Sequence, residues 1–402
     1  MVTLQKIKEA RERIGGSVFV SPCSRSETFS ELIDNNVFLK LENLQMTGSF
    51  KERGALNKIL TLTPEERGRG LIAASAGNHA QAVSFHASKR GIAAQICMPL
   101  TTPLNKVMST RRYGADVILH GANYDEACEE ALRRCAADGL TFVHPFDDHA
   151  VIAGQGTLGL ELLEQIPDLE VVITAIGGGG LISGLACALK EINPKIRVIG
   201  VQTARLPSMR AALAAKHPVI LPVSSTLADG IAVRRAGDLT LPLVQKYVDD
   251  IVTVEEEEIA HAILLLLERE KTLAEGAGAA PVATLLQRKV ACIGKKIVAI
   301  ISGGNLDVSI LSRIIERGLV KDGRLIRLRI HLPDYPGALH RLTGVLARHR
   351  ANIVETSYNR AYYGVSLGDT AIDLTMETRG SEHVGELLAA LESEKYDFER
   401  IQ

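Results

Sequence analysis

A lysine with the position of a reactive amine stands in the run TGSFKER at residues 47–53. Ser49 and Glu52 have the spacing of a capping box, which predicts a helix that begins here with Lys51 in its first turn. The positive end of a helix dipole disfavours a cation, so we expect the pKa of Lys51 to be lowered. Most helical lysines are solvated partners of an acid, but an amine placed after a strand end and a glycine could form a Schiff base.

Two further loops open helices with groups that can hold an anion. In SAGNH at residues 75–79, small residues let backbone amides approach a carboxylate or phosphate, and Asn78 offers both a donor and an acceptor. The four glycines 177–180, followed by Leu181, stand between the apolar run VVITAI and a helix. Their amides predict a cradle suited to a phosphate, because a tight turn alone would explain one or two glycines but not four.

The glycine run does not fit a dinucleotide site. The third glycine of that motif is missing, because Ile182 and Ser183 occupy the two places where it would stand. The next strand ends in Gln202, where a carboxylate would be needed to bind a ribose. Nicotinamide binding is therefore disfavoured.

A fourth element, SGGN at residues 302–305, closes the last strand of the large unit. A hydroxyl at the carboxyl end of a strand, here that of Ser302, points into the crevice where open α/β sheets bind ligands. By itself this element would be read as a turn, and it gains meaning only together with the other three.

Short apolar runs alternate with longer helical patterns up to about residue 320, which predicts an α/β fold with one or two parallel sheets. Several runs are apolar throughout, as strands covered on both faces require. The expected strands are residues 37–42, 70–75, 93–99, 116–121, 141–145, 171–177, 197–202, 250–255 and 296–302.

The order of elements changes after the polar hinge VKDGRLI at residues 320–326. Beyond it the patterns read strand, helix, strand, strand, helix, strand, which is the order of a small ferredoxin-like domain. We therefore place a first domain at residues 1–322 and a second at 323–402. The first should divide again, with a small lobe of roughly residues 48–152 inserted in a larger lobe.

The composition is that of a globular enzyme, with 46% apolar and 23% charged residues. The charges of the 46 Lys and Arg nearly cancel those of the 47 Asp and Glu, so non-specific electrostatic binding of nucleic acid is disfavoured. There is also no Trp on which bases could stack. The six cysteines form no CxxC pair, and the charged N-terminal helix lacks the apolar core of a secretion signal. A reducing cytoplasm fits. The uncharged stretch 171–189 is better explained by a strand, a glycine loop and a helix than by a membrane span.

Together the four elements resemble the fold-type II pyridoxal-phosphate enzymes, and most closely the threonine dehydratases, also called threonine ammonia-lyases. The resemblance extends from about Ser21 to Leu319 and includes the runs KLENLQMTGSFKERGA, HPFDDHAVIAGQGT, LADGIAV and ISGGNLD. It implies a two-lobed unit built on parallel sheets, like the β subunit of tryptophan synthase, that binds pyridoxal 5′-phosphate.

Site roles follow from the resemblance by position. Lys51 would hold the cofactor as a Schiff base, Phe50 would lie against the ring, and Asn78 would bond the ring hydroxyl. The phosphate would rest on Gly177, Gly178, Gly179, Gly180 and Leu181. Ser302 would face the pyridine nitrogen. The substrate carboxylate would sit on Ser75, Ala76, Gly77, Asn78 and His79.

A neutral hydroxyl at Ser302 cannot keep the pyridine nitrogen protonated, which weakens the ring as an electron sink and favours β-elimination over transamination. We expect Lys51 to remove the α-proton and the β-hydroxyl to leave with a proton, supplied by the cofactor phosphate. From threonine the products would be 2-oxobutanoate and ammonia. Serine differs by one methyl, worth only ~1 to 3 kcal/mol, so serine turnover as a side activity is expected.

Three departures from the family refine this expectation. Serine racemases carry a serine at the place of Ala76, and a methyl group cannot transfer a proton, so racemisation should be poor. The segment 202–208 has no carboxylate where some relatives bind a divalent ion, so we assign no metal site. Glu275 stands in the run AEGAGA, where relatives often read AEPSGA, and it either lies near the cofactor or is a solvated residue at a helix end.

The C-terminal domain resembles an ACT domain, a regulatory module that binds amino acids between paired subunits. The resemblance rests on the loop DYPGAL at 334–339 and on NI at 352–353. The expected effector residues are Asp334, Pro336, Gly337, Ala338, Leu339, Asn352 and Ile353. By analogy the effector would be isoleucine or valine, the end products of the biosynthetic pathway, acting on a homo-oligomer, a dimer or tetramer, through a shift between quaternary states. A pure oligomerisation domain is the alternative.

Other functions stay open at this point. A serine or hydroxyaspartate dehydratase, or a cysteine synthase, would share the same motifs, and a substrate panel would separate them. From a different class, the chain could be a catalytically silent amino-acid sensor, which would bind isoleucine without releasing ammonia.

Overall fold

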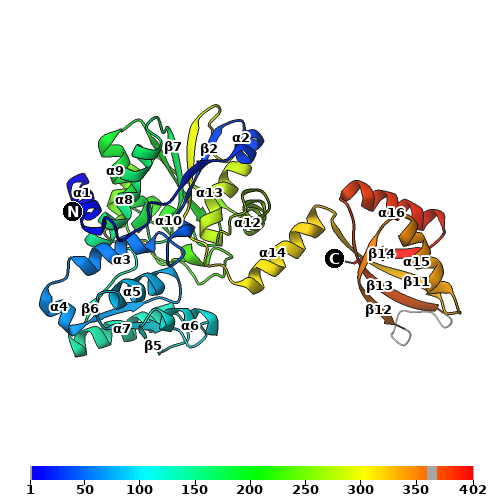
Figure 1. Ribbon diagram of the computed structural model, residues 1–402, viewed down its shortest axis with the longest axis horizontal. Coiled ribbons are helices and arrows are strands. Elements are labelled where there is room, and N and C mark those ends of the chain that lie inside the picture. The colour runs from blue at the N-terminus through cyan, green and yellow to red at the C-terminus, as the bar shows by residue number, and fades with distance from the viewer. Residues whose placement is uncertain (1, 360–368, 402) are drawn as a thin grey trace. The chain divides into compact units, whose positions relative to one another are not determined.

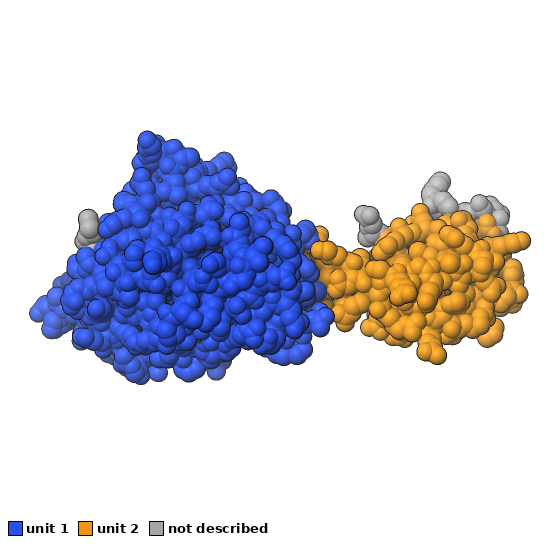
Figure 2. Space-filling view, turned by 90° about the horizontal axis from the view of Figure 1, so that it is seen from above, with its two compact units in different colours: residues 1–306 blue, residues 307–402 orange. Residues whose placement is uncertain are grey.

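The computed structural model describes residues 2–359 and 369–401 and divides the chain into two compact units, Met1–Leu306 and Asp307–Gln402 (Figure 2). This division falls before the hinge expected near residue 322. Helix α14, Val308–Lys321, therefore groups with the second unit, where it packs on strand β11, Leu325–Pro333, and buries Ile314.

A sheet of six strands forms the centre of the larger lobe, in the order β1-β2-β10-β7-β8-β9. Only β1 runs antiparallel to its neighbour. Helices α8 and α9 pack on one side of this sheet and α13 on the other (Figure 1), which explains why β7 is buried at every residue. The strands are β1 (Cys23–Arg25), β2 (Asn36–Leu41), β7 (Val171–Ala175), β8 (Arg197–Thr203), β9 (Asp250–Val254) and β10 (Lys296–Ile301).

A second, fully parallel sheet of order β5-β4-β3-β6 forms the small lobe, and its strands lie between β2 and β7 in the chain. Its strands are β3 (Leu71–Ala74), β4 (Ala94–Met98), β5 (Asp116–Leu119) and β6 (Thr141–Phe142). All nine strands expected from the apolar runs are present, and the prediction of a two-lobed parallel α/β unit is confirmed. The boundaries of the small lobe, 48–152, stay a prediction.

The helices of the first unit connect these strands. They are α1 (Leu4–Ile14), α2 (Glu27–Ile33), α3 (Lys51–Leu60), α4 (Pro64–Arg69), α5 (Asn78–Ser88), α6 (Leu104–Arg112), α7 (Tyr124–Asp138), α8 (His149–Gln165), α9 (Gly180–Ile192), α10 (Ser208–Ala215), α11 (Thr240–Tyr247), α12 (Glu256–Glu270) and α13 (Gly276–Leu286), with 3₁₀ turns η1 (Glu42–Leu44) and η2 (Asp229–Ile231). The uncharged stretch 171–189 is β7, the glycine loop and the start of α9, as expected. No helix among the described residues is long and apolar enough to cross a membrane.

The second unit contains an antiparallel sheet of order β12-β13-β11-β14, with one face buried under α15 and α16. After β11 come α15 (Ala338–Arg348), β12 (Asn352–Asn359), β13 (Asp369–Glu377), α16 (Ser381–Ser393) and β14 (Asp397–Arg400). The expected strand-helix-strand-strand-helix-strand order is present. Strand β12 runs to the edge of the described residues.

Helices α8 and α9 cross closely because glycine lies at the contact. A Cβ on Gly184 would stand 2.2 Å from the carbonyl oxygen of Ile152 and 2.6 Å from the amide nitrogen of Gly156. The clash is with backbone, which cannot rotate away as a side chain can. The glycines therefore set the distance between α8 and α9.

We expect Gly184→Ala to destabilise the protein by ~1 to 3 kcal/mol or more, because the added methyl forces the two helices apart. The measurement is the free energy of unfolding in denaturant. Gly68→Ala is the control, since α4 has open space at that position. That change should be neutral or stabilise by up to ~1 kcal/mol through helix propensity. Equal stability of the two variants would contradict the assignment.

Candidate active site

Lys51 is the first residue of α3, and its amine donates a hydrogen bond to the carbonyl oxygen of Pro145 at 2.8 Å. The backbone before it is fixed to the end of β10, because Phe50 donates its amide to the carbonyl of Ser302 at 3.0 Å. The Phe50 ring centroid lies 5.3 Å from the Lys51 amine. The structure thus joins the first and fourth elements of the sequence.

Burial lowers the pKa of Lys51 to about 8, and the opposing charge of Glu275 limits the fall. The lowered pKa was expected, but the main cause is removal from water rather than the helix dipole. A neutral amine is a nucleophile and a base, so the lowered pKa increases the reactive fraction of Lys51 near neutral pH.

The expected capping box is wrong. Helix α3 is preceded by Phe50 with no side-chain cap, and the hydroxyl of Ser49 is buried without a hydrogen-bond partner among the described residues. The Glu52 carboxylate instead accepts from the amide of Thr47 and lies 3.3 Å from the ring of His86. Glu52 turns away from the helix start because this buried pairing is available to it.

The glycine loop leads directly into α9, with Gly179 at φ +98° as the residue before the helix. A Cβ on Gly178 would lie 2.4 Å from the ring of Phe146, and one on Gly179 would lie 2.6 Å from Met209 and 2.8 Å from Thr240. Among the described residues, no protein atom accepts from the amides of residues 178–181. These amides, at the positive end of a helix, form a cradle for an anion.

A short segment connects the lysine to this cradle. Pro145 accepts from Lys51, and the next residue, Phe146, packs its ring against Gly178. The carboxylate of Asp147 accepts from the amides of residues 238–240, and the Thr240 hydroxyl donates to the Gly178 carbonyl at 2.6 Å. The adjacent residues Pro145 and Phe146 therefore bring the amine and the glycine loop close together, which is compatible with the single site expected from the sequence.

Asn78 is held between two polar side chains from distant parts of the chain. Its Nδ2 donates to Glu275 at 2.8 Å, and its Oδ1 accepts from Asn305 at 2.6 Å. Asn305 also donates to the carbonyl of Thr47 at 2.8 Å. This chain of bonds joins the starts of α5, α13 and α3 at one place.

Glu275 lies inside the site and is not a solvated residue at a helix end. Its side chain is 4% exposed, and burial, with the charge of Asp229 as the next cause, raises its pKa to about 7. A buried acid usually pairs with a cation, but the hydrogen-bond donor to Glu275 is the neutral side-chain amide of Asn78. Glu275 can therefore gain or lose a proton near neutral pH.

Ser302 lies at the carboxyl end of β10 and is buried, and its hydroxyl makes no hydrogen bond to a described residue. It is free to meet a ring nitrogen. Leu181 is buried in the first turn of α9. Phe50 and the backbone of Ser302 thus lie next to Lys51, Asn78 is connected through Asn305 to Thr47, and the glycine loop is connected through Phe146.

The expected substrate loop, residues 75–79, is partly open. Ser75, Ala76, Gly77 and Asn78 are partly exposed, but the His79 ring is buried and bonds the carbonyl of Val143 at 2.8 Å. Burial lowers the pKa of His79 to about 3. His79 can therefore offer a backbone amide to a substrate carboxylate, but not a charged ring.

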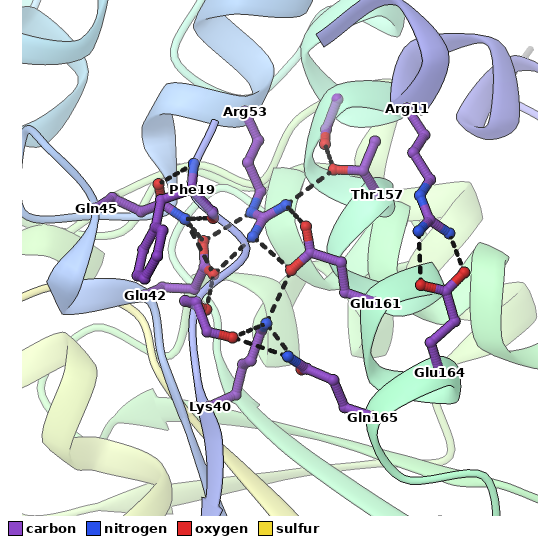
Figure 3. A network of polar contacts seen from close by, with 12 residues as sticks. Arg11, Phe19, Lys40, Glu42, Gln45, Arg53, Thr157, Glu161, Glu164 and Gln165 are labelled. Carbon is purple, nitrogen blue, oxygen red and sulfur yellow. Dashed lines mark hydrogen bonds and ion pairs between the residues drawn. The ribbon is translucent and has the colours of Figure 1, made fainter. Parts of the chain in front are cut away.

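Buried charges hold α3 in place (Figure 3). Arg53 directs both edges of its guanidinium at two carboxylates, Glu42 and Glu161, with hydrogen bonds of 2.6 to 2.9 Å. Lys40 joins Glu161 at 2.8 Å and also bonds the carbonyl of Ser21 at 2.7 Å. Two cations and two anions thus compensate one another, and every one of them is fully or nearly fully buried.

Comparison with known proteins shows to which enzyme family this chain belongs. Residues 14–303 match the family model described as pyridoxal-phosphate dependent enzyme, and the chain belongs to that family. It is 50% identical over 397 residues to the L-threonine ammonia-lyase of Thermotoga maritima, with 99% of each chain covered. It is 45% identical over 315 residues to the catabolic L-threonine dehydratase of Escherichia coli, which covers 78% of this chain and 96% of that protein. Among solved structures, maize serine racemase has a TM-score of 0.75 and 35% identity, covering 80% of this chain and 98% of that chain.

The observed groups fit pyridoxal phosphate. Lys51 is a poorly solvated amine that can bond an aldehyde, and the unpartnered amides of residues 178–181 suit a phosphate. Asn78 and Ser302 supply polar groups for a ring hydroxyl and a ring nitrogen. We propose these residue roles from geometry and resemblance together.

Sequence reasoning missed several participants. Asn305 stands in the quoted SGGN run, and its place beside a strand end was a usable signal. Lys40 and Glu42, two charges in and directly after an apolar strand, signalled a buried network. The carbonyl of Pro145 had no signal, because any residue supplies one.

We expect Lys51→Ala to abolish covalent attachment of pyridoxal phosphate, because the Schiff base needs this amine. Visible absorbance retained after dialysis, and mass after borohydride reduction, measure attachment. In the wild type, attachment should rise with pH through about 8, as the amine loses its proton.

Lys58→Ala is the matched control, since Lys58 lies on the same helix and pairs with Asp148 at 2.7 Å. It should retain the bound cofactor. Equal loss in both variants would show that α3, rather than the Lys51 amine, had been disturbed.

Proposed function

We propose that this protein is an L-threonine ammonia-lyase that converts L-threonine to 2-oxobutanoate and ammonia, with L-serine as a secondary substrate. The observation that carries the proposal is a buried lysine of lowered pKa that shares the Pro145–Phe146 segment with a phosphate-type glycine loop. The full-length similarity to the Thermotoga enzyme supports the substrate.

Bound pyridoxal phosphate supplies an electron-accepting ring next to the substrate α-carbon. The chain's own residues do the rest. Lys51 would hold the cofactor, and its amine, when free, would act as the base that takes the α-proton; its lowered pKa suits this task near neutral pH. The partly exposed loop 75–78 orients the substrate carboxylate through its backbone amides.

Ser302 favours elimination over competing reactions. A hydroxyl at the end of β10 can hydrogen-bond a ring nitrogen but cannot hold a proton there, so less negative charge is drawn into the ring. Loss of the β-hydroxyl then competes well with transamination. Glu275 keeps its carboxyl on Asn78 rather than on Ser302, so the nearby acid does not reverse this preference.

Racemisation is the second activity to consider, since maize serine racemase is a similar solved structure. Ala76 opposes it, because a methyl group on the substrate loop cannot return a proton to the opposite face of the α-carbon. A serine or hydroxyaspartate dehydratase and a cysteine synthase remain alternatives that a substrate comparison separates.

We expect the holoenzyme to release 2-oxobutanoate from L-threonine with a higher kcat/KM than it releases pyruvate from L-serine, within the ~10 to 200-fold range of one methyl group. Coupled reduction of the 2-oxo acid measures both. Formation of D-serine should be minor. A preference for hydroxyaspartate, or for an acylated serine with a thiol, would overturn the substrate; binding without ammonia release would indicate a sensor.

We infer that the second unit is an ACT-like regulatory domain that binds isoleucine or valine in a homo-oligomer. The Escherichia coli relative matches only 315 residues here, yet these are 96% of its own length, which supports a catalytic part complete without this unit. The role in isoleucine biosynthesis stays a prediction. The cytoplasmic location also stays a prediction, and the free thiols of the six cysteines are compatible with it.

The expected effector residues fall at opposite ends of the second unit's sheet. Pro333, just before the 334–339 loop, pairs with Asp369, whereas Asn352 and Leu325 both pair with Glu377. Eight residues of strand separate the two ends, which is roughly 27 Å. A site that uses both the loop and Asn352 therefore needs two copies of the chain.

We expect Leu339→Glu and Asn352→Ala each to abolish isoleucine or valine binding, measured by calorimetry on the full-length protein. Leu339 is 39% exposed in the first turn of α15, so a charge there should fold normally. Mixing the two unfolded variants and refolding them together should restore part of the binding, because one interface then combines two intact halves. Binding that is unchanged in both variants would refute this site.

A further inference from the structure

An ion pair joins the two lobes of the first unit beside the proposed active site. Lys106, on α6 of the small lobe, lies 2.7 Å from the carboxylate of Asp229, in the turn η2 of the larger lobe. The side chains are 22% and 55% exposed, respectively, so both are in contact with solvent. An ion pair in contact with solvent adds little to stability, so stability alone does not explain why this pair joins the two lobes beside the site.

The backbone next to Asp229 lies against Glu275. A Cβ on Gly230 would stand 2.9 Å from Glu275 Oε1, and a Cβ on Gly276 would stand 2.5 Å from the carbonyl oxygen of Leu227. The turn that carries Asp229 is therefore packed directly on the start of α13. Glu275 in turn accepts from Asn78, so the pair is one step removed from the residue proposed to meet the cofactor ring.

We propose that Lys106 and Asp229 are a positioning pair that sets the charge state of Glu275, and through it the charge presented to Asn78. The pair acts at a distance through its field and touches neither substrate nor cofactor. Because its members come from different lobes, any movement of one lobe against the other changes this field.

Four groups around Glu275 define the balance. Burial raises its pKa, Asp229 raises it further, and the hydrogen bond from Asn78, the charge of Lys106 and the charge of Lys51 lower it. Asp229 belongs to η2, Lys106 to α6, and Lys51 to α3, so each facing element contributes a charge of known sign. Neutralising either member of the pair therefore has a predictable direction.

The two single substitutions should shift the pKa of Glu275 in opposite directions. Lys106→Met leaves Asp229 uncompensated and raises the pKa, whereas Asp229→Asn removes the anion, leaves the cation and lowers it. Since both side chains are in contact with solvent, which screens their charges, we expect each shift to be modest and the two shifts to differ in sign. A merely structural role would give changes of the same sign, because either substitution breaks the same contact.

The first measurement is the thermal midpoint of the cofactor-free protein between about pH 5 and 9. The pKa of Glu275 is higher in the folded protein than in the unfolded chain, so ionising this buried carboxyl destabilises the fold. The loss of stability is absent at pH values below the pKa of the unfolded chain, grows as the pH rises, and is complete above about pH 7. The fall in thermal midpoint caused by Glu275 is obtained by comparison with the same protein carrying Glu275→Gln. This fall should end at a higher pH in Lys106→Met than in the wild type, and at a lower pH in Asp229→Asn. In the Glu275→Gln background, neither substitution should move the profile.

The second measurement is the pH profile of kcat/KM for threonine, which rests on the proposed function. Its limb near neutral pH should move in the same opposite directions, and added salt should reduce the separation. Lys190→Met is the matched control, since Lys190 and Asp249 form a pair at 2.7 Å elsewhere in the unit, and it should move neither profile.

Shifts of the same sign in both variants, or shifts that persist without Glu275, would overturn the proposal. The cofactor-free measurement decides the matter even if threonine is not turned over. Failure of the positioning pair is thereby distinguished from failure of the proposed activity.

Discussion

The arrangement of the first unit depends on the buried charges around Arg53. Its guanidinium saturates two carboxylates that come from different elements, Glu42 beside β2 and Glu161 on α8, while it stands only two residues after Lys51. Two residues correspond to about half a turn of helix, so Arg53 and Lys51 point to opposite sides of α3. Fixing one side of the helix in rotation therefore fixes the direction of the reactive amine on the other.

The network tolerates no loss of a single member, because its two cations and two anions reach a net charge of zero only when all four are present. Removing one partner from such a network leaves a buried charge without compensation and costs ~3 to 5 kcal/mol. The network contributes directional constraint more than net stability, since hydrophobic residues of equal volume could fill the same space. A helix held by apolar contacts alone could rotate by small amounts, whereas bidentate hydrogen bonds tolerate little rotation.

The sequence was sufficient to predict elements whose signal is local. Apolar runs located nine of the ten strands that the structure describes in the first unit, and the glycine run located the start of α9; the short edge strand β1, Cys23–Arg25, has no apolar run and was missed. It was insufficient where the outcome depends on distant partners. Ser49 and Glu52 have capping-box spacing, but the Thr47 amide and His86 offered Glu52 a buried alternative. Lys106 and Asp229 are 123 residues apart, and no local pattern pairs them. The division at residue 306 likewise follows from the packing of α14, which composition does not reveal.

The placement of ionisable groups separates this site from one that would favour transamination. The first unit brings one titratable carboxyl, Glu275, close to Gly303, where a Cβ would stand 2.6 Å from its oxygen. Gly303 directly follows Ser302, so the acid lies within one residue of the position proposed for the pyridine nitrogen. The amide of Asn78 holds this acid, and the neutral hydroxyl of Ser302 occupies the other position. Since an acid at the ring nitrogen would deepen the electron sink, a displacement of one residue along the β10 end is enough to change which reaction the same cofactor performs.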